Sequence, residues 1–313
     1  MRNLIDDTNF DFMGKHRLAM VISGTLVVLA LAAILIRGLN FGVDFTGGYT
    51  IEVQYQEAPD LNLIRKTLVD AELPESLVQT FGSSTQVLIR MAPGEQGSSS
   101  ADISTNVLRA LTPTSENPIE MRRVEFVGPQ VGEELREKGG LAVLAALFAI
   151  VVYIWLRFEK KFSIGSVMAL VHDVIITVGF FALFQIEFDL TILAALLAVI
   201  GYSLNDTIVV FDRIRENFRL MRSGTPAEVI NGSINQTLSR TVITSMTTLL
   251  VLASLFLFGG KIINGFSLAL IIGVIVGTYS SIFVASLAVH ALGISKEDLM
   301  PVEKEGAEME EYP

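Results

Sequence analysis

Runs of apolar residues long enough to cross a membrane recur six times along the chain. A helix needs about 20 mostly apolar residues to span the hydrocarbon core of a bilayer. The predicted spans are 18–36, 141–156, 162–184, 190–210, 240–258 and 266–292. Because five more spans follow the first, we interpret residues 18–36 as an uncleaved helix and not as a signal peptide. The pattern therefore predicts a polytopic α-helical membrane protein with six transmembrane helices.

The segment 37–140, between the first two spans, has the periodicities of a folded domain. Alternation of apolar and polar residues predicts strands, and apolar positions three or four apart predict helices. In chain order we expect a strand at Tyr49–Tyr55, a helix at Asp60–Ala71, a hairpin of Ser76–Phe81 with Gln86–Met91, a flexible loop at Ala92–Ala101, a helix at Ala101–Leu111 and a strand at Ile119–Val127. The order βαββαβ predicts one α+β ferredoxin-like domain.

Positive charge in the short loops predicts the orientation of the spans. Basic residues concentrate in the loops after the second and fourth spans, at Arg157, Lys160, Lys161, Arg213, Arg215, Arg219 and Arg222. The opposite short loops hold no basic residue (185–189) or one (Lys261). Since cytoplasmic loops carry the excess of Lys and Arg, both termini, 1–17 and 293–313, are predicted to be cytoplasmic. The domain 37–140 is then predicted to lie outside, in the periplasm.

The cytoplasmic loop 211–239 has helical signals of its own. Asp212–Arg222 continues the fourth helix, and Gly224 is a plausible residue to end it. Thr225-Pro226-Ala227-Glu228 has the form of a capping box with proline at the first helical position. We therefore expect a helix over Pro226–Leu238 that lies near the membrane surface before the fifth span and forms a structural elbow.

Composition narrows the kinds of function the chain can have. It is 51% hydrophobic with a mean hydropathy of +0.53, and only 18% of its residues are charged, against about a quarter in soluble domains. There is no cysteine, and the three histidines His16, His172 and His290 are scattered, so we predict no metal site and no cofactor. A net charge of −10, half of it in the acidic tail, argues against nucleic-acid binding. No P-loop is present, so any energy input is expected to be ionic or to come from a partner.

Ionisable residues inside the spans are the candidates for chemistry, because burying a charge there costs at least ~2.5–3.5 kcal/mol. His172 and Asp173 lie roughly 16 Å deep in the third span. Asp206 lies roughly 10 Å inside the fourth. The candidate proton-pathway residues are Asp206 and Arg240, with Asn205, His172, Asp173, Thr244 and Thr248 as further members.

Each of these candidates also has a structural interpretation. Arg240 could be an interfacial anchor, the Ser/Thr face of the fifth span could serve close helix packing, and Asp206 could form a buried salt bridge with Arg240. His172 and Asp173 are either a second relay element or a packed polar pair. For Asp206 we favour proton transfer, because low dielectric increases the proton affinity of a carboxylate and an approaching arginine decreases it.

Five motifs in this order and spacing resemble those of the SecD/SecF family. They are Phe41–Gly48 (FGVDFTGG), Val127–Gly132 (VGPQVG), Val171–Asp173 (VHD), Asn205–Asn217 (NDTIVVFDRIREN) and Ser239–Ser245 (SRTVITS). The single extracytoplasmic domain and the DFTGG form are similar to the SecF branch of that family and not to the SecD branch. The resemblance covers nearly the whole chain.

This resemblance implies a role in protein export in the bacterial inner membrane. A SecF-type chain would pair with SecD in a twelve-helix assembly similar to RND transporters, and join the SecYEG channel, usually with YajC. It would act on exported unfolded polypeptide, use the proton-motive force to help complete translocation, and not be an enzyme. By motif, Asp206 and Arg240 correspond to the proton-pathway residues of the family.

Two other functions stay open on the sequence alone. One is an RND-type proton-coupled exporter of small molecules or lipids, although such chains usually carry twelve spans and two large extracytoplasmic domains. The other is an intramembrane aspartyl protease that uses Asp173 and Asp206, which requires the two carboxylates to share a proton.

Overall fold

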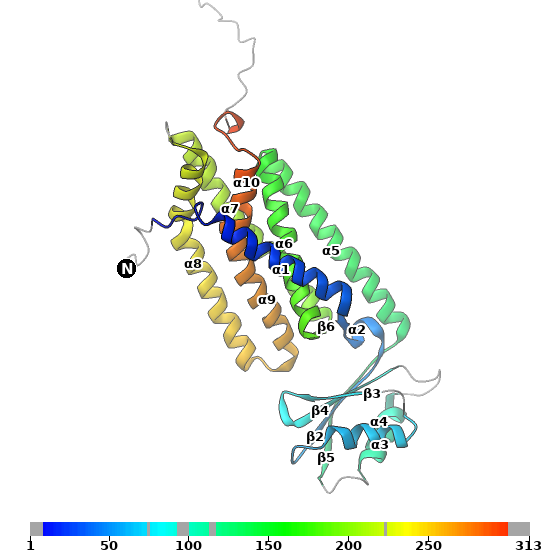
Figure 1. Cartoon of the computed structure of the whole chain (residues 1–313). Helices are drawn as coiled ribbons and strands as arrows, with labels where there is room; N and C mark the ends of the chain where they lie inside the picture. Colours follow the sequence, from blue (N-terminus) through cyan, green and yellow to red (C-terminus); the bar gives the residue numbers. More distant parts are fainter. Residues whose placement is uncertain (1–8, 74–75, 93–99, 113–116, 222–223, 300–313) are drawn as a thin grey trace, which may run out of the picture.

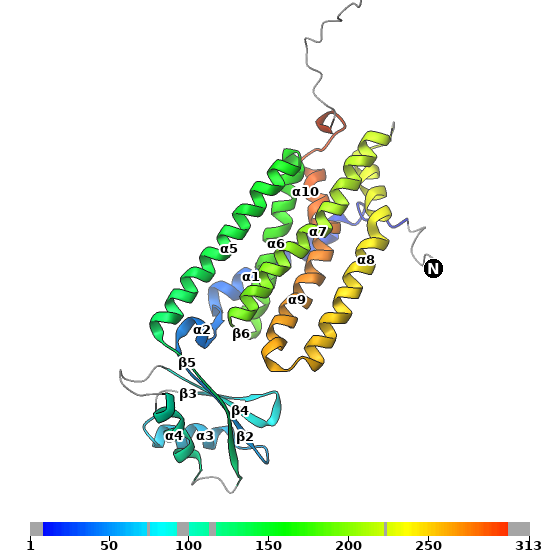
Figure 2. The same cartoon turned by 180° about the vertical axis from the view of Figure 1, so that it is seen from behind.

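Six helical segments long and apolar enough to cross a membrane make up most of the structure, so the six predicted spans are confirmed. The structure is a computed structural model that describes residues 9–73, 76–92, 100–112, 117–221 and 224–299. The helices form one bundle, and a small sheet domain extends from one end of it (Figures 1 and 2). The spans are α1 (His16–Arg37), α5 (Pro129–Arg157), α6 (Lys160–Phe184), α7 (Leu190–Leu220), α8 (Pro226–Phe258) and, in sequence, α9 (Lys261–Ser280), the π-helical turn Ser281–Ala285 and α10 (Ser286–Ala291).

Close packing of α7 against α9 depends on two glycines. Gly273 faces Val199, and a Cβ atom added there would overlap that side chain. At Gly277 an added Cβ would lie 3.0 Å from the Cβ of Ser203, so a larger residue would require Ser203 to shift. The small-xxx-small pattern in the last span therefore marks a real contact between helix backbones.

The prediction of a separate elbow helix in the loop 211–239 is wrong, because α8 runs without a break from Pro226 to Phe258. The capping box itself is present: Thr225 Oγ1 accepts from the Glu228 backbone N–H at 3.3 Å, and Glu228 Oε2 accepts from Thr225 N–H at 2.8 Å. No proline follows within the helix, so nothing in the local sequence ends it before the span. The preceding helix α7 ends at Leu220, four residues before Gly224.

The predicted α+β domain lies between the first and second spans, and its sheet is antiparallel in the order β3-β4-β2-β5. Its elements are β2 (Gly48–Tyr55), α3 (Leu61–Asp70), β3 (Ser76–Phe81), β4 (Ser83–Met91), α4 (Ser100–Leu111) and β5 (Ile119–Val127). Each helix connects two strands that have one other strand between them, which agrees with a split βαβ sandwich. Both helices cover the same face of the sheet (Figure 1).

The core of this domain is formed by alternate residues of the strands and by one side of each helix. Ile51, Val53 and Val87 are fully buried against Leu68 of α3 and Val107 of α4. The predicted hairpin differs in one respect, because β4 begins at residue 83 and the turn is shorter than expected. The predicted loop at 92–101 lies largely outside the described residues, as does the acidic tail from residue 300 onward.

A short segment between α1 and β2 connects the domain to the bundle. Strand β1 (Asn40–Phe41) pairs in parallel with β6 (Glu187–Phe188), which lies between α6 and α7. The helical turn α2 (Val43–Thr46) follows, and its Phe45 is buried with Phe181 and Phe188 of the bundle. The segment that leads to the sheet is therefore packed into the membrane-spanning part.

Candidate functional site

Helix α7 carries polar residues on two different sides near its middle. Asp206 and Ser203 face the interior of the bundle and are 3% and 1% exposed. Gly201 and Asn205, one turn apart, are on the exposed side of the same helix. The sequence thus places a buried carboxylate and an exposed amide next to each other in one span.

The groups that act on the Asp206 carboxylate come from α8. They are the hydroxyl of Ser245 and the charge of Arg240. Among the described residues, Oδ2 of Asp206 has no hydrogen-bond partner. Arg240 is exposed, and no ion pair joins it to Asp206 in the part of the chain that the structure describes. The buried salt bridge considered from the sequence is therefore not formed in this conformation.

A chain of hydroxyl groups extends from Ser245 toward α9. Ser245 Oγ and Thr278 Oγ1 share a hydrogen bond of 2.7 Å, and the Tyr202 hydroxyl donates to Ser245 Oγ at 3.4 Å. These contacts connect α7, α8 and α9 next to Asp206. The environment of the carboxylate is thus polar on the α8 and α9 sides.

A second buried carboxylate, Asp173 of α6, is the centre of another polar cluster. Its Oδ1 is 2.8 Å from His172 Nδ1, and its Oδ2 accepts from the hydroxyl of Ser280 at 2.6 Å and from that of Ser203. Asp173 is 0% exposed. Three helices therefore meet at one carboxylate, and Ser203 connects it to the turn of α7 that precedes Asp206.

The cluster around Asp173 continues to the first span. The ring of His172 stacks on Tyr279 with centroids 6.3 Å apart, and the Tyr279 hydroxyl lies 2.9 Å from both Ser23 Oγ and the Ala19 carbonyl oxygen of α1. Ser280 directly precedes the π-helical turn Ser281–Ala285. Such turns interrupt the regular helix and are frequent at functional sites.

The structure does not bring every sequence candidate to these two carboxylates. Thr244 and Thr248 donate to carbonyl oxygens of their own helix, both at 2.9 Å. Asn205 and His290 are exposed. Sequence reasoning assigned no partner role to Ser280, Tyr279 and Thr278, although four consecutive hydroxyl residues, 278–281, in an apolar span are a signal that could have indicated one.

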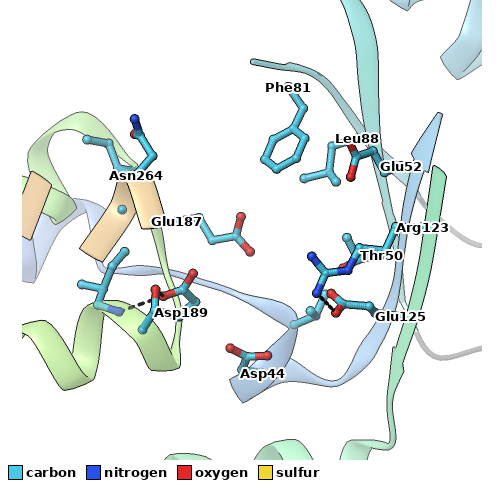
Figure 3. Close-up of a pocket in the computed structure, with 15 residues that line it drawn as sticks. Asp44, Thr50, Glu52, Phe81, Leu88, Arg123, Glu125, Glu187, Asp189 and Asn264 are labelled. Carbon is cyan, nitrogen blue, oxygen red and sulfur yellow. Dashed lines mark hydrogen bonds and ion pairs between the residues drawn. The ribbon is translucent and has the colours of Figure 1, made fainter. Parts of the chain in front are cut away.

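Ionisable groups also gather where the sheet domain meets the bundle. Asp44, Glu187 and Asp189 lie around a cavity of about 330 Å³ that Arg123 and Glu125 of β5 also line (Figure 3). Nearby, Arg90 of β4 forms an ion pair with Glu187. Burial lowers the pKa of Arg90 to about 10, while the charges of Asp189 and Asp44 act in the opposite direction.

These features define a class: polytopic membrane proteins with ionisable side chains buried between their helices and a small extramembrane α+β domain. Two family models match the chain. One is the protein export membrane protein SecD/SecF, C-terminal, over residues 107–294, and the other is the SecD/SecF GG motif, over residues 32–59. The chain belongs to the SecD/SecF family and is a multi-pass bacterial membrane protein.

Full-length relatives and solved structures agree with this assignment. The chain is 51% identical over 304 residues to the protein translocase subunit SecF of Vibrio alginolyticus (96% of each chain), and 48% identical to that of Escherichia coli O157:H7 (96% of this chain and 93% of the relative). The crystal structure of SecDF from Thermus thermophilus superposes with a TM-score of 0.83 at 38% identity. That match covers 92% of this chain but only 39% of the longer SecDF chain.

Proposed function

We propose that this chain is the SecF subunit of a proton-driven complex that promotes late translocation of exported proteins. Its partner is SecD, and the pair works with the SecYEG channel and YajC in the bacterial inner membrane. Support comes from the similarity to SecF translocase subunits and from the solved SecDF chain, in which a region like this one is part of a longer polypeptide. The chain is a subunit of a translocase and not an enzyme.

The exposed side of the bundle supports a membrane-embedded partner. Asn205 of α7 and Arg240 of α8 are exposed although they belong to helices long enough to span the membrane. A polar side chain that faces lipid is costly, and such residues usually face a partner helix or a water-filled cavity. Gly201, on the same side of α7 as Asn205, would let another helix approach closely. A second half-bundle such as that of SecD would cover this side.

The observation that carries the proposal is the unsatisfied carboxylate of Asp206. It is buried, one oxygen has no partner among the described residues, and Arg240, whose charge acts on it, forms no ion pair with it in the described part of the chain. We infer that Asp206 takes up and releases a proton, and that Arg240 modulates its proton affinity by approaching and withdrawing. Asn205, Thr244 and Thr248 would line the water route to the site, and His172 and Asp173 would hold the helices that form it.

Export driven by an imposed proton-motive force tests this proposal. Asp206→Asn keeps the shape of the side chain and removes its titration, so export should lose its dependence on the proton-motive force while assembly with SecD persists. Asp212→Asn on the same helix is the matched control, since Asp212 is only partly buried and pairs with Arg157 and Arg215. Normal proton-dependent export by Asp206→Asn would show that Asp206 is not the carrier.

A further inference from the structure

The sheet domain is attached to the bundle through one narrow neck. The chain enters the sheet at Gly48, directly after α2, and leaves it at Val127, directly before α5. These two crossings touch each other, because a Cβ added to Gly47 would lie 2.8 Å from the Cα of Pro129. The backbone at Gly47 and Gly48 has φ values of 71° and 125°, which favour glycine. The neck thus joins the domain to the bundle at the end of the sheet where Gly48 pairs with Val127.

Beside the neck, an ion pair joins the two parts. Arg90 of β4 contacts Glu187 of β6, and of the ion pairs formed by the described residues this one alone crosses from the sheet to the bundle. Arg90 is only 8% exposed, and its Nε has no hydrogen-bond partner in the part of the chain that the structure describes. A cation this deeply buried is stable only beside compensating negative charge.

The compensating charge is supplied by the residues that hold the first turn of α7. Asp189 accepts from the Ile192 backbone N–H at 2.9 Å as the N-cap of α7. Asp44 Oδ2 accepts from the Leu190 N–H at 3.1 Å. With Glu187, three carboxylates therefore surround the start of this helix, and the electrostatic influence of Asp44 and Asp189 reaches Arg90. Arg123, which lines the cavity that Asp44, Glu187 and Asp189 surround, pairs instead with Glu125 of its own strand.

Open space borders both partners of the ion pair. Glu187 lines the cavity of about 330 Å³ shown in Figure 3, and Arg90 lines another of about 440 Å³. The ion pair and its neighbouring carboxylates therefore contribute to the position of β4 relative to β6. Loss of the cation would remove the attraction between β4 and these carboxylates, so this edge would be held less tightly.

We propose that Arg90 is a positioning residue that clamps the extramembrane domain onto the first turn of α7. The domain and α7 then move as one body, and Asp206 lies roughly 25 Å further along that same helix. Sheet movement would thereby be transmitted to the helix that carries the buried carboxylate. This proposal concerns the contact between Arg90 and the start of α7, and it can be tested whether or not Asp206 carries a proton.

The test measures the distance between the sheet and the bundle by electron–electron double resonance in the full chain, reconstituted in lipid nanodiscs. Spin labels are attached at Ser84→Cys on β4 and Ser254→Cys on α8, and they are unique because the chain has no cysteine. We expect Arg90→Met to broaden the distance distribution and to shift it to longer distances. Arg90→Lys keeps the charge and should retain the narrow distribution. Arg123→Met is the matched control and should also leave it narrow.

Two further variants separate charge compensation from damage to the sheet. Glu187→Gln in the Arg90→Met background removes the carboxylate that has lost its cation, so it should partly restore the narrow distribution. Glu187→Arg places a like charge opposite Arg90 from outside the sheet, and it should broaden the distribution while the sheet keeps its native sequence. A distribution for Arg90→Met identical to that of Arg123→Met, or an unchanged distribution for Glu187→Arg, would overturn the proposal.

Discussion

The two buried carboxylates of the bundle differ in how their oxygens are satisfied. Asp173 is completely buried, and both of its oxygens have partners, in His172, Ser203 and Ser280. Asp206 is nearly as buried, but one of its oxygens has no partner among the described residues. Ser203 and Asp206 are three residues apart on α7, so one helix contributes to both sites.

This contrast indicates two different roles for chemically identical groups. A carboxylate held by three donors from three helices is tied to one geometry, and it ties those helices to each other. A carboxylate such as Asp206, with one oxygen that has no partner among the described residues, can accept a proton or a water molecule. We therefore infer that Asp173 is an anchor and Asp206 is the group that changes its protonation state.

The largest expected effect on stability belongs to Asp173→Asn. The asparagine amide has no negative charge for the three donors to bind, and its NH₂ group faces one of those donors. The substitution should therefore lower the free energy of unfolding by about 2–3 kcal/mol. Asp206→Asn should cause no comparable loss. Thermal melting of the tagged chain, followed by size-exclusion chromatography, measures both variants. Equal destabilisation by the two substitutions would remove the distinction between anchor and carrier.

Arg240→Lys should have an effect on transport and not on stability. The guanidinium of Arg240 has no ion pair or hydrogen bond among the described residues, so no folded-state contact is lost. Lysine keeps the charge but lacks the planar fork, so proton-dependent export should fall by at most about tenfold. Complete loss of export with normal stability would mean that the fork itself is required.

Two serine variants compare the clusters directly. Ser280→Ala removes one donor to Asp173 and should destabilise the chain by about 1.5 kcal/mol, because the acceptor is a buried carboxylate. Ser245→Ala removes the 2.7 Å contact with Thr278 and should cost about 1 kcal/mol, while it also slows proton-dependent export. Melting and export measurements on the same preparations would show whether stability and transport separate as expected. A transport defect in Ser280→Ala larger than that in Ser245→Ala would contradict the account.

The smallest expected effect is that of Thr244→Val combined with Thr248→Val. Both hydroxyls donate to carbonyls of their own helix, so their loss should change the free energy of unfolding by less than about 0.5 kcal/mol. Their oxygens remain free to accept from water, so proton flux should decrease modestly. A flux equal to that of the unmodified chain would exclude both threonines from the water route.

The hydrophobic pattern was enough to predict the spans and the order of elements in the sheet domain, because these depend on local periodicity. The pattern did not predict that the helix starting at Pro226 continues without a break into the fifth span. The capping box at Thr225 showed where a helix begins, but only the absence of a breaking residue decides how far it runs. The π-helical turn at Ser281–Ala285 likewise has no local sequence signal that we could identify.

The candidate site was only partly accessible from the sequence. Asp206 and Asp173 could be found because ionisable groups in apolar spans are rare. Their partners could not be found in this way. Ser280 lies 107 residues after Asp173 and contacts it only because α6 packs against α9. Arg90 and Glu187 are likewise joined only by the position of the sheet against the bundle. Contacts of this kind depend on tertiary packing, and periodicity carries no information about them.

Proton flux in proteoliposomes shows which of the two buried carboxylates carries the proton. The chain would be reconstituted with SecD, a pH gradient imposed in sodium-free buffer, and the internal pH followed with a trapped dye. Per folded molecule, Asp206→Asn should reduce the flux to that of protein-free liposomes, whereas Asp173→Asn should retain it. Flux that persists in Asp206→Asn and disappears in Asp173→Asn would reverse the two roles and contradict the account.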